Sequence, residues 1–335
     1  MTWLAYRRHR TNLLILLGLA LGLGLWMVYV AHGFNTVPLK LGPYSDGTVY
    51  RYRNYFRGPA LLRLPYQADA IVYLLLAFPA MAGALLGAPL VAGELDGATN
   101  RLAWTQGITR TRWLVTKWAV VGIPMVLLGW FLALITQWWY HHVIVVGPGG
   151  GVFGTVLNSG VSRIDPQSFS TTGLAPVAYT LFAFALGTAL GALLRRVSLA
   201  AIGTLVIYGL LALVMVSTVR PTLLPQTFIP TPYPSENIST FVIPTAQATW
   251  YLDSGYEFLP GFHNSSGPSA DTLGHQCEGS GNVVPCLERN AIVPGNYVQP
   301  DANYWPLQWR ESLIYVIAAG VLLLASLGSV RRWRA

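Results

Sequence analysis

Charged side chains are scarce in this chain of 335 residues, because Asp, Glu, Lys and Arg together make up only 10% of it. Soluble domains carry about 25% charged residues, so the shortage excludes an ordinary soluble enzyme. The sequence also lacks the G-x-x-x-x-G-K-[ST] motif, whose backbone and lysine hold nucleotide phosphates. We therefore expect no ATPase site, no catalytic residues, and no cofactor or metal site in this chain. Energy for any transport must come from a partner or from an ion gradient.

Long apolar runs take the place of charge, since 53% of the residues are hydrophobic. A helix needs about 20 apolar residues to cross a membrane, and the sequence has uncharged windows of that length at 12–31, 70–92, 117–139, 173–194, 197–218 and 312–330. Such runs cannot be barrel strands, which alternate and have about 10 residues. The sequence thus predicts an all-α integral membrane protein with six transmembrane helices. Lys117 is the only charge inside these windows, and we expect its stem to snorkel toward water.

The first apolar window follows three arginines, as a secretory signal would. Its apolar run is too long for a signal, and Tyr29-Val30-Ala31 lacks the small-x-small cleavage pattern, so we expect an uncleaved anchor. Residues 1–11 combine basic and aromatic side chains, and we expect them to form an N-terminal interfacial segment.

Basic residues are distributed unevenly between the two sides of the predicted helices. Together with Lys117, the side that holds both termini, the 93–116 segment and the 195–196 turn carries 12 of the 21 Lys and Arg residues but only two of the 13 acids. The short segments of the other side carry six basic residues, five of them in 33–67. Short cytoplasmic loops are enriched in basic residues. The sequence therefore predicts a multi-pass protein of the cell membrane with both termini in the cytoplasm.

Three segments are expected on the outer side. Two of them are the loops 33–67 and 140–172, which lie within 12–218, the part of the chain that holds the first five helices. The largest segment, 219–310, has five prolines near its start and is long enough to form an extracellular cap between the fifth and sixth helices. Residues 311–335 then supply the sixth helix and a basic cytoplasmic tail.

The only two cysteines, Cys277 and Cys286, both fall in the predicted cap. Outside the cytosol such a pair favours a disulfide, and closing a loop of about 10 residues would stabilise the fold by about 2 to 3 kcal/mol. The alternatives are two unpaired thiols or a metal site. A metal site is less favoured, because His275 is the only imidazole nearby and structural zinc sites have four ligands.

The segment 93–116, between the second and third predicted helices, has the most informative pattern. Leu95, Ala98 and Leu102, followed by Thr105 or Gln106, are spaced three or four residues apart. A short helix here would present a small apolar ridge to a partner.

Within this segment the chain resembles ABC-2 type transporter permeases, in particular their actinobacterial branch. The resemblance rests on an ordered set of residues: Glu94, Thr99, Leu102, Thr105, Ile108, Thr109, Arg110 and Lys117. Further likeness lies in 3–10, in 104–106, in 109–113, and in 304–308 with Glu311. It covers the six-helix plan from end to end and the predicted cap only loosely.

The resemblance implies a type V exporter-like fold in which 93–116 is a coupling segment, seated in a groove of a separate ATPase subunit that holds ATP and Mg²⁺. The residues implied to couple are Glu94, Leu95, Gly97, Thr99, Arg101, Leu102, Thr105, Gln106, Thr109 and Arg110. Two ATPases and two permeases, the second being another copy or a paralogue, would form the exporter. Apart from the resemblance, the neutral and aromatic-rich predicted helices favour a hydrophobic or amphipathic substrate. The basic charge then reflects topology in a lipid bilayer and needs no nucleic-acid partner.

Other readings of these features remain. Glu94 is either a coupling carboxylate or a helix-end charge satisfied by Arg101 or by backbone, and Arg101 and Arg110 either contact the ATPase or only fix topology. The whole chain could instead be an ion-coupled secondary transporter, or a membrane-anchored sensor whose extracellular cap binds a ligand. The predicted helices have no acid, lysine or histidine at mid-depth, where ion-coupled transporters place such groups, and this favours the exporter.

Overall fold

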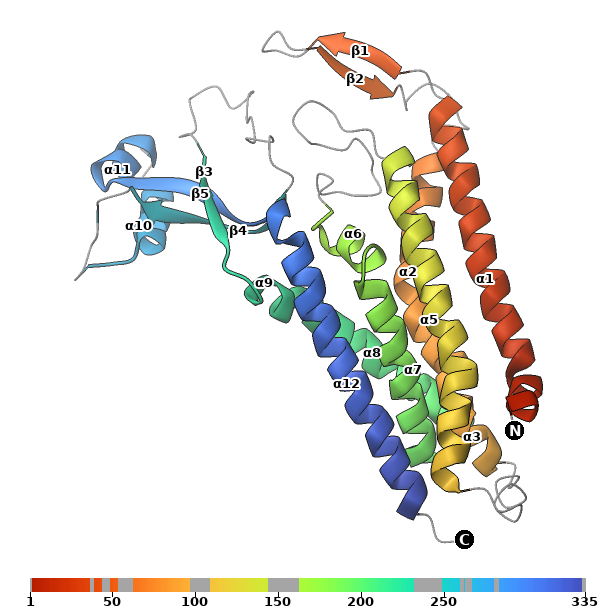
Figure 1. Ribbon diagram of the computed structural model, residues 1–335. Coiled ribbons are helices and arrows are strands. Elements are labelled where there is room, and N and C mark those ends of the chain that lie inside the picture. Colours follow the sequence, from red (N-terminus) through yellow and green to blue (C-terminus); the bar gives the residue numbers. More distant parts are fainter. Residues whose placement is uncertain are drawn as a thin grey trace.

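The computed structural model describes residues 2–36, 39–43, 49–53, 63–96, 109–143, 163–231, 249–259, 262, 267–279 and 283–332. Figure 1 shows long helices packed side by side, with small β elements at one end of the bundle. Both termini lie at the other end. We call the end with the termini the terminal end and the opposite one the sheet end.

Among the residues listed above, six helical segments are long and apolar enough to cross a membrane, which confirms the predicted number: 9–33, 67–94, 110–140, 175–194, 197–222 and 301–332. They are built from α1 (Thr2–Thr36), α2 (Arg63–Ala82), η1 (Gly83–Gly87), α3 (Ala88–Asp96), α5 (Arg110–Val143), α7 (Ala175–Leu194), α8 (Val197–Val214), η2 (Met215–Val219), α9 (Arg220–Thr222), η4 (Asp301–Asn303) and α12 (Tyr304–Arg332). The predicted helical membrane fold is therefore confirmed as mostly helical, with the strands outside the spans. The second and fifth spans each contain a π-helical turn, η1 and η2, which are rare and often found at functional positions.

The β elements all lie outside the six spans. β1 (Leu39–Pro43) and β2 (Val49–Arg53) form an antiparallel hairpin, and α6 (Pro166–Thr171) is a short helix before α7. Residues 227–300, which we call the sheet module, contain β3 (Thr227–Pro230), β4 (Thr249–Phe258), α10 (Ala270–Glu278), α11 (Val283–Arg289) and β5 (Ile292–Pro300). The three strands are antiparallel in the order β3-β5-β4. In Figure 1 the module extends sideways from the start of α12, away from the bundle.

The apolar core of the bundle is divided into two units. The first unit comprises α1, α2 and α5, and its core includes Leu16, Met27, Phe78 and Trp139. The second unit comprises α7, α8 and α12, and its core consists largely of small and aromatic side chains. In the second unit Tyr179, Phe182, Tyr208 and Tyr315 contact one another through their ring edges or tilted faces, Tyr179 and Tyr315 with centroids 4.7 Å apart. Edge-to-face pairs of this kind add about 0.5 to 1.5 kcal/mol each beyond the area they bury.

Glycines line the seam between the two units. A Cβ on Gly87 of η1 would lie 2.6 Å from the carbonyl oxygen of Phe184 in α7, and one on Gly191 of α7 would lie 2.5 Å from that of Ala88. Gly122 of α5 similarly faces the Phe184 ring, which itself belongs to the first core. Small residues let helix backbones approach closely in membranes. The contact between the units is therefore close, with backbone against backbone at the glycines and the Phe184 ring of α7 inserted into the core of the first unit.

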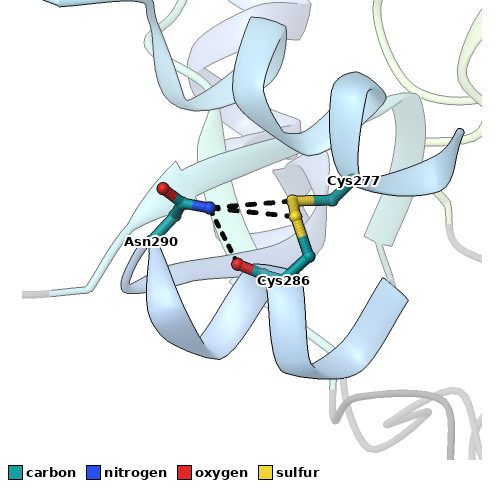
Figure 2. Close-up of a disulfide and its surroundings, with 3 residues drawn as sticks. All are labelled: Cys277, Cys286 and Asn290. Carbon is teal, nitrogen blue, oxygen red and sulfur yellow. Dashed lines mark hydrogen bonds between the residues drawn. A yellow bond between two sulfur atoms is a disulfide. The ribbon is translucent and has the colours of Figure 1, made fainter. Parts of the chain in front are cut away.

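The sheet module contains the predicted disulfide. Cys277, in α10, is bonded to Cys286, in α11, and both residues belong to the module's own small core. Figure 2 shows Asn290 beside the bond, where its amide donates to the Cys286 carbonyl at 2.8 Å and contacts both sulfurs at 3.8 Å. The disulfide holds α10 and α11 together at one end of the three-stranded sheet.

The seam predicts that Gly87→Ala destabilises the protein by about 1 to 3 kcal/mol, because the added methyl group overpacks against the Phe184 carbonyl. Gly209→Ala is the matched control. Gly209 lies in α8 with no atom within 4 Å of an added Cβ, and we expect a change within about 0.5 kcal/mol. Thermal unfolding of the purified protein in detergent checks both. Equal midpoints for the two variants would refute a close-packed seam.

The exposed face of α10 predicts a pH-dependent local stability. Tyr256 donates to Glu278 at 2.6 Å, and His275 lies 3.0 Å from the same carboxylate. The Tyr256 hydrogen bond, then that of His275, lowers the pKa of Glu278, and the hydrogen bond with Glu278 raises the pKa of His275. The Glu278 contribution is present above about pH 4.3 and lost in acid, and the His275 contribution is present below about pH 6.5 and lost as pH rises through its folded pKa.

We therefore expect amide exchange of 270–279, corrected for intrinsic rates, to be slowest between about pH 4.3 and about pH 6.5. Glu278→Gln should remove this optimum. A flat profile for the unsubstituted protein would contradict the assignment.

Candidate coupling site

A buried ion pair lies at the terminal end, where α3 leads into the predicted coupling segment. The Nζ atom of Lys117, in α5, is 2.5 Å from Oε1 of Glu94, in α3. It also donates to the Leu90 carbonyl at 3.0 Å and lies 4.2 Å from the centre of the Trp113 ring. The side chain of Lys117 is only 5% exposed, so the prediction that it snorkels to water is wrong. α3 supplies the Glu94 carboxylate and the Leu90 carbonyl oxygen within reach of Lys117, and these replace water.

A buried charge is tolerated when an opposite charge lies next to it. Moving an ion out of water costs several kcal/mol after relaxation, and removing one partner of a buried pair costs about 3 to 5 kcal/mol. Glu94 is 8% exposed. The pair therefore fixes the end of α3 against α5. The structure places Glu94 in an ion pair with Lys117. Arg101, the partner considered from the sequence, lies outside the described residues.

The start of α5 is held by the end of α12. Arg110 donates through Nη1 to the carbonyl oxygens of Arg331, at 3.1 Å, and Val330, at 3.4 Å. In return, Nε of Arg331 donates to the Thr111 hydroxyl at 3.3 Å. A guanidinium at a helix C-terminus satisfies carbonyls that have no intrahelical partner and complements the helix dipole. Thr109 accepts a hydrogen bond from the backbone N–H of Arg112 at 3.3 Å and so caps the first turn of α5.

A small apolar core joins these contacts. Val91 of α3, Trp113 and Leu114 of α5, Ala192 of α7 and Val330 of α12 pack together and are almost fully buried. Helices from both units thus meet directly beneath the two points where the predicted coupling segment leaves and rejoins the bundle. A displacement of either point would be transmitted to four helices.

The predicted coupling residues are only partly within the described structure. Glu94 and Leu95 lie in α3, Thr109 directly precedes α5, and Arg110 is its first residue. Six others lie outside the described residues, as does the side chain of Leu95: Gly97, Thr99, Arg101, Leu102, Thr105 and Gln106. The structure therefore places Glu94 and Arg110 at the root of the segment, by which we mean the two points where it leaves and rejoins the bundle. Glu94 is bound there to Lys117, and Arg110 to the end of α12.

A second buried ion pair, at the sheet end, was not among the predicted site residues. Arg220 follows η2 and Glu311 lies in α12, and both side chains are at most 1% exposed. Nε and Nη2 of Arg220 donate to Oε2 and Oε1 of Glu311 at 2.7 and 2.9 Å. One pattern in the sequence could have indicated this pair. Each of the two residues lies just outside a charge-free window, and the helices extend beyond the windows, so both residues fall within a span. Opposite charges at two such borders at the same end of the bundle are candidates for pairing.

A family model described as ABC-2 membrane transporter related matches residues 14–220, which run from within the first span to within the fifth and include the predicted coupling segment and Arg220. No curated protein and no solved structure matches the chain.

The buried pair predicts that Lys117→Met destabilises the protein by about 3 to 5 kcal/mol, because the Glu94 carboxylate then stays buried without this ammonium. The double substitution Lys117→Met/Glu94→Leu removes both charges and should recover most of the loss. Thermal unfolding in detergent measures both. A double variant as unstable as the single one would show that lost packing, and not an unpaired buried charge, causes the loss of stability.

Proposed function

This chain belongs to the ABC-2 membrane transporter-related family, and on that premise we propose that it is the membrane-spanning subunit of an ATP-driven exporter. Family membership makes it a multi-pass transporter permease. The family in general works with ABC ATPase subunits. The direction of transport, the substrate and the assembly are our proposals.

The observation that carries the proposal is the way in which the root of the predicted coupling segment is held. On one side Glu94 is bound to Lys117, and on the other Arg110 is bound to the carbonyls that end α12. A separate ATPase that grips residues 97–108 would therefore act directly on α3 and α5, and on α12 through Arg110. A loop used only as a connection needs neither contact.

We propose that the terminal end faces the cytoplasm, where ATP is available, and that the sheet module faces outward. The excess of basic residues at the terminal end supports this orientation, because short cytoplasmic loops are basic. The disulfide in the sheet module supports it too, since disulfides persist outside the reducing cytosol. We further propose two permeases and two ATPases per complex, following the resemblance described above.

The cargo that we propose is hydrophobic or amphipathic. The two ion pairs buried within the spans, Glu94–Lys117 and Arg220–Glu311, neutralise their own charges. An ionic cargo would need charges that remain available to it.

The Arg220–Glu311 pair also favours a second candidate, an ion-coupled transporter, because ionisable groups inside membrane spans often form ion or proton pathways. The two candidates differ in their energy source. If the second candidate is right, vesicles that contain this chain alone should accumulate substrate when a proton or sodium gradient is imposed across them.

The decisive experiment is purification of the full-length, tagged chain from its native membranes. We expect an ABC ATPase to co-purify, and the complex in lipid nanodiscs to hydrolyse ATP in a vanadate-sensitive way. In inside-out vesicles it should accumulate a fluorescent amphipathic dye when ATP is added. Gradient-driven dye uptake without any ATPase would reject the exporter.

Substitutions of two neighbouring arginines test whether the bond between α5 and α12 at the root of the segment is needed for transport by that complex. Arg110→Ala should lower ATP-driven dye uptake several-fold, because it frees the start of α5 from α12. Arg112→Ala, an exposed position on the same turn, should leave uptake unchanged. Equal effects of the two substitutions would mean that only local positive charge matters.

A further inference from the structure

Arg220 is the most extensively bonded side chain of the sheet end. Besides its two bonds to Glu311, its Nη2 lies 3.0 Å from both the Tyr179 hydroxyl and the Ser170 hydroxyl, and its Nη1 donates to the Pro166 carbonyl at 3.3 Å. The guanidinium carbon also lies 4.3 Å from the centre of the Phe169 ring. Tyr179 in turn donates to Glu311. One buried side chain therefore joins the end of the fifth span to α6, α7 and α12.

A second polar side chain of α12, Gln308, continues this hydrogen-bond network toward the sheet module. One turn before Glu311, the Gln308 side chain accepts from the backbone N–H groups of Leu174 and Ala175, at 3.0 and 2.8 Å, and so caps α7. Its amide donates to the carbonyls of Phe169 and Thr172. All the hydrogen-bonding capacity of Gln308 is used. We call Arg220, Glu311, Tyr179 and Gln308 together the polar clasp.

The sheet module is attached to the same place. Gln299, at the end of β5, is fully buried and donates to the carbonyls of Pro221 and Leu224, at 3.2 and 2.9 Å, directly after Arg220. Trp250, in β4, packs against the core of the second unit. The position of the module therefore depends on the residues that follow Arg220, and these depend on the clasp.

The seam with the first unit is built differently. Seam glycines of both units meet backbone, as Gly87 and Gly191 do, or a ring, as Gly122 does. A Cβ on Gly129 of α5 would lie 3.5 Å from Cβ of Thr180. The π-helical turn η1 lies in this seam and forms part of it. Packed helices can shift past one another by small sliding movements, and backbone contacts at glycines leave few side chains to repack, with the Phe184 ring as the exception. The interlocked aromatic rings and the multiply bonded Arg220 hold the helices of the second unit together more firmly.

We infer that the chain moves as two units that slide along the glycine seam, and that Arg220 is the positioning residue that makes the sheet module part of the second unit. The sliding rests on the proposed function only for its driving force. The clasp, by contrast, is a property of this chain alone. Its consequence is that the module follows α12 whenever the second unit shifts.

Distances between spin labels test both halves of the inference. The chain's two cysteines are joined to each other, so only introduced cysteines take the label. Leu127→Cys in α5 with Leu324→Cys in α12 measures across the seam, and Glu288→Cys in α11 with Leu324→Cys measures from module to second unit, all at exposed positions. In nanodiscs we expect one narrow module distance, and a seam distance that shifts when the co-purified complex is trapped with ATP, Mg²⁺ and vanadate.

The clasp is tested by removing its charge pair without leaving one charge buried. Arg220→Met/Glu311→Leu should fold, because apolar replacement of a buried pair is often neutral, yet it should broaden the module distance and leave the seam distance unchanged. Arg163→Gln is the matched control. It breaks a more exposed ion pair with Asp301, also at the sheet end, and the module distance should stay narrow.

The seam is tested by a covalent link. Gly129→Cys and Thr180→Cys place two Cβ atoms at a separation that suits a disulfide. Oxidation should abolish the shift of the seam distance, and either single substitution should not. A seam distance that is the same in all nucleotide states, or a module distance unchanged in Arg220→Met/Glu311→Leu, would overturn the inference. Absence of a co-purifying ATPase would refute the proposed function instead, while the module distance would still report on the clasp.

Discussion

A charge buried in a membrane-spanning bundle must be matched by an opposite charge and by further hydrogen bonds, because its desolvation costs several kcal/mol. Two such pairs determine much of this structure. Glu94–Lys117 fixes the helix ends from which the predicted coupling segment emerges, and Arg220–Glu311 fixes the sheet end. They lie at opposite ends of the spans and on different helices. Between them the packing is almost entirely apolar, so the two ends communicate through rigid helices and not through a chain of charges.

Much of the helical plan could be predicted from the sequence, because the cost of placing charge in lipid leaves charge-free windows. All six windows lie on spans of the structure, except that the fourth window starts two residues before its span. The disulfide was also predictable, since the chain has only two cysteines and both fall in one polar segment. These features depend on composition over long stretches, which a single sequence displays well.

The ion pairs could not be predicted in the same way, because they depend on where helices end and which ends meet. Arg220 and Glu311 stand 91 residues apart and just outside their windows. Lys117 was recognised as the one charge within a window, but an ammonium that snorkels and one that pairs have the same sequence signal. The strands of the sheet module likewise arise from tertiary pairing. The π-helical turns η1 and η2 leave no pattern by which they could be recognised.

The sheet module enters and leaves the bundle through neighbouring strands. Thr227, where β3 begins, lies opposite Val298 near the end of β5, so the two attachment points are about 5 Å apart. In topological terms the module is an insertion between two membrane helices, and its two ends lie side by side. Its size and content can therefore change between these two points without any change in the spacing of the helices that carry it. An unrelated binding domain with adjacent termini could be grafted there in its place.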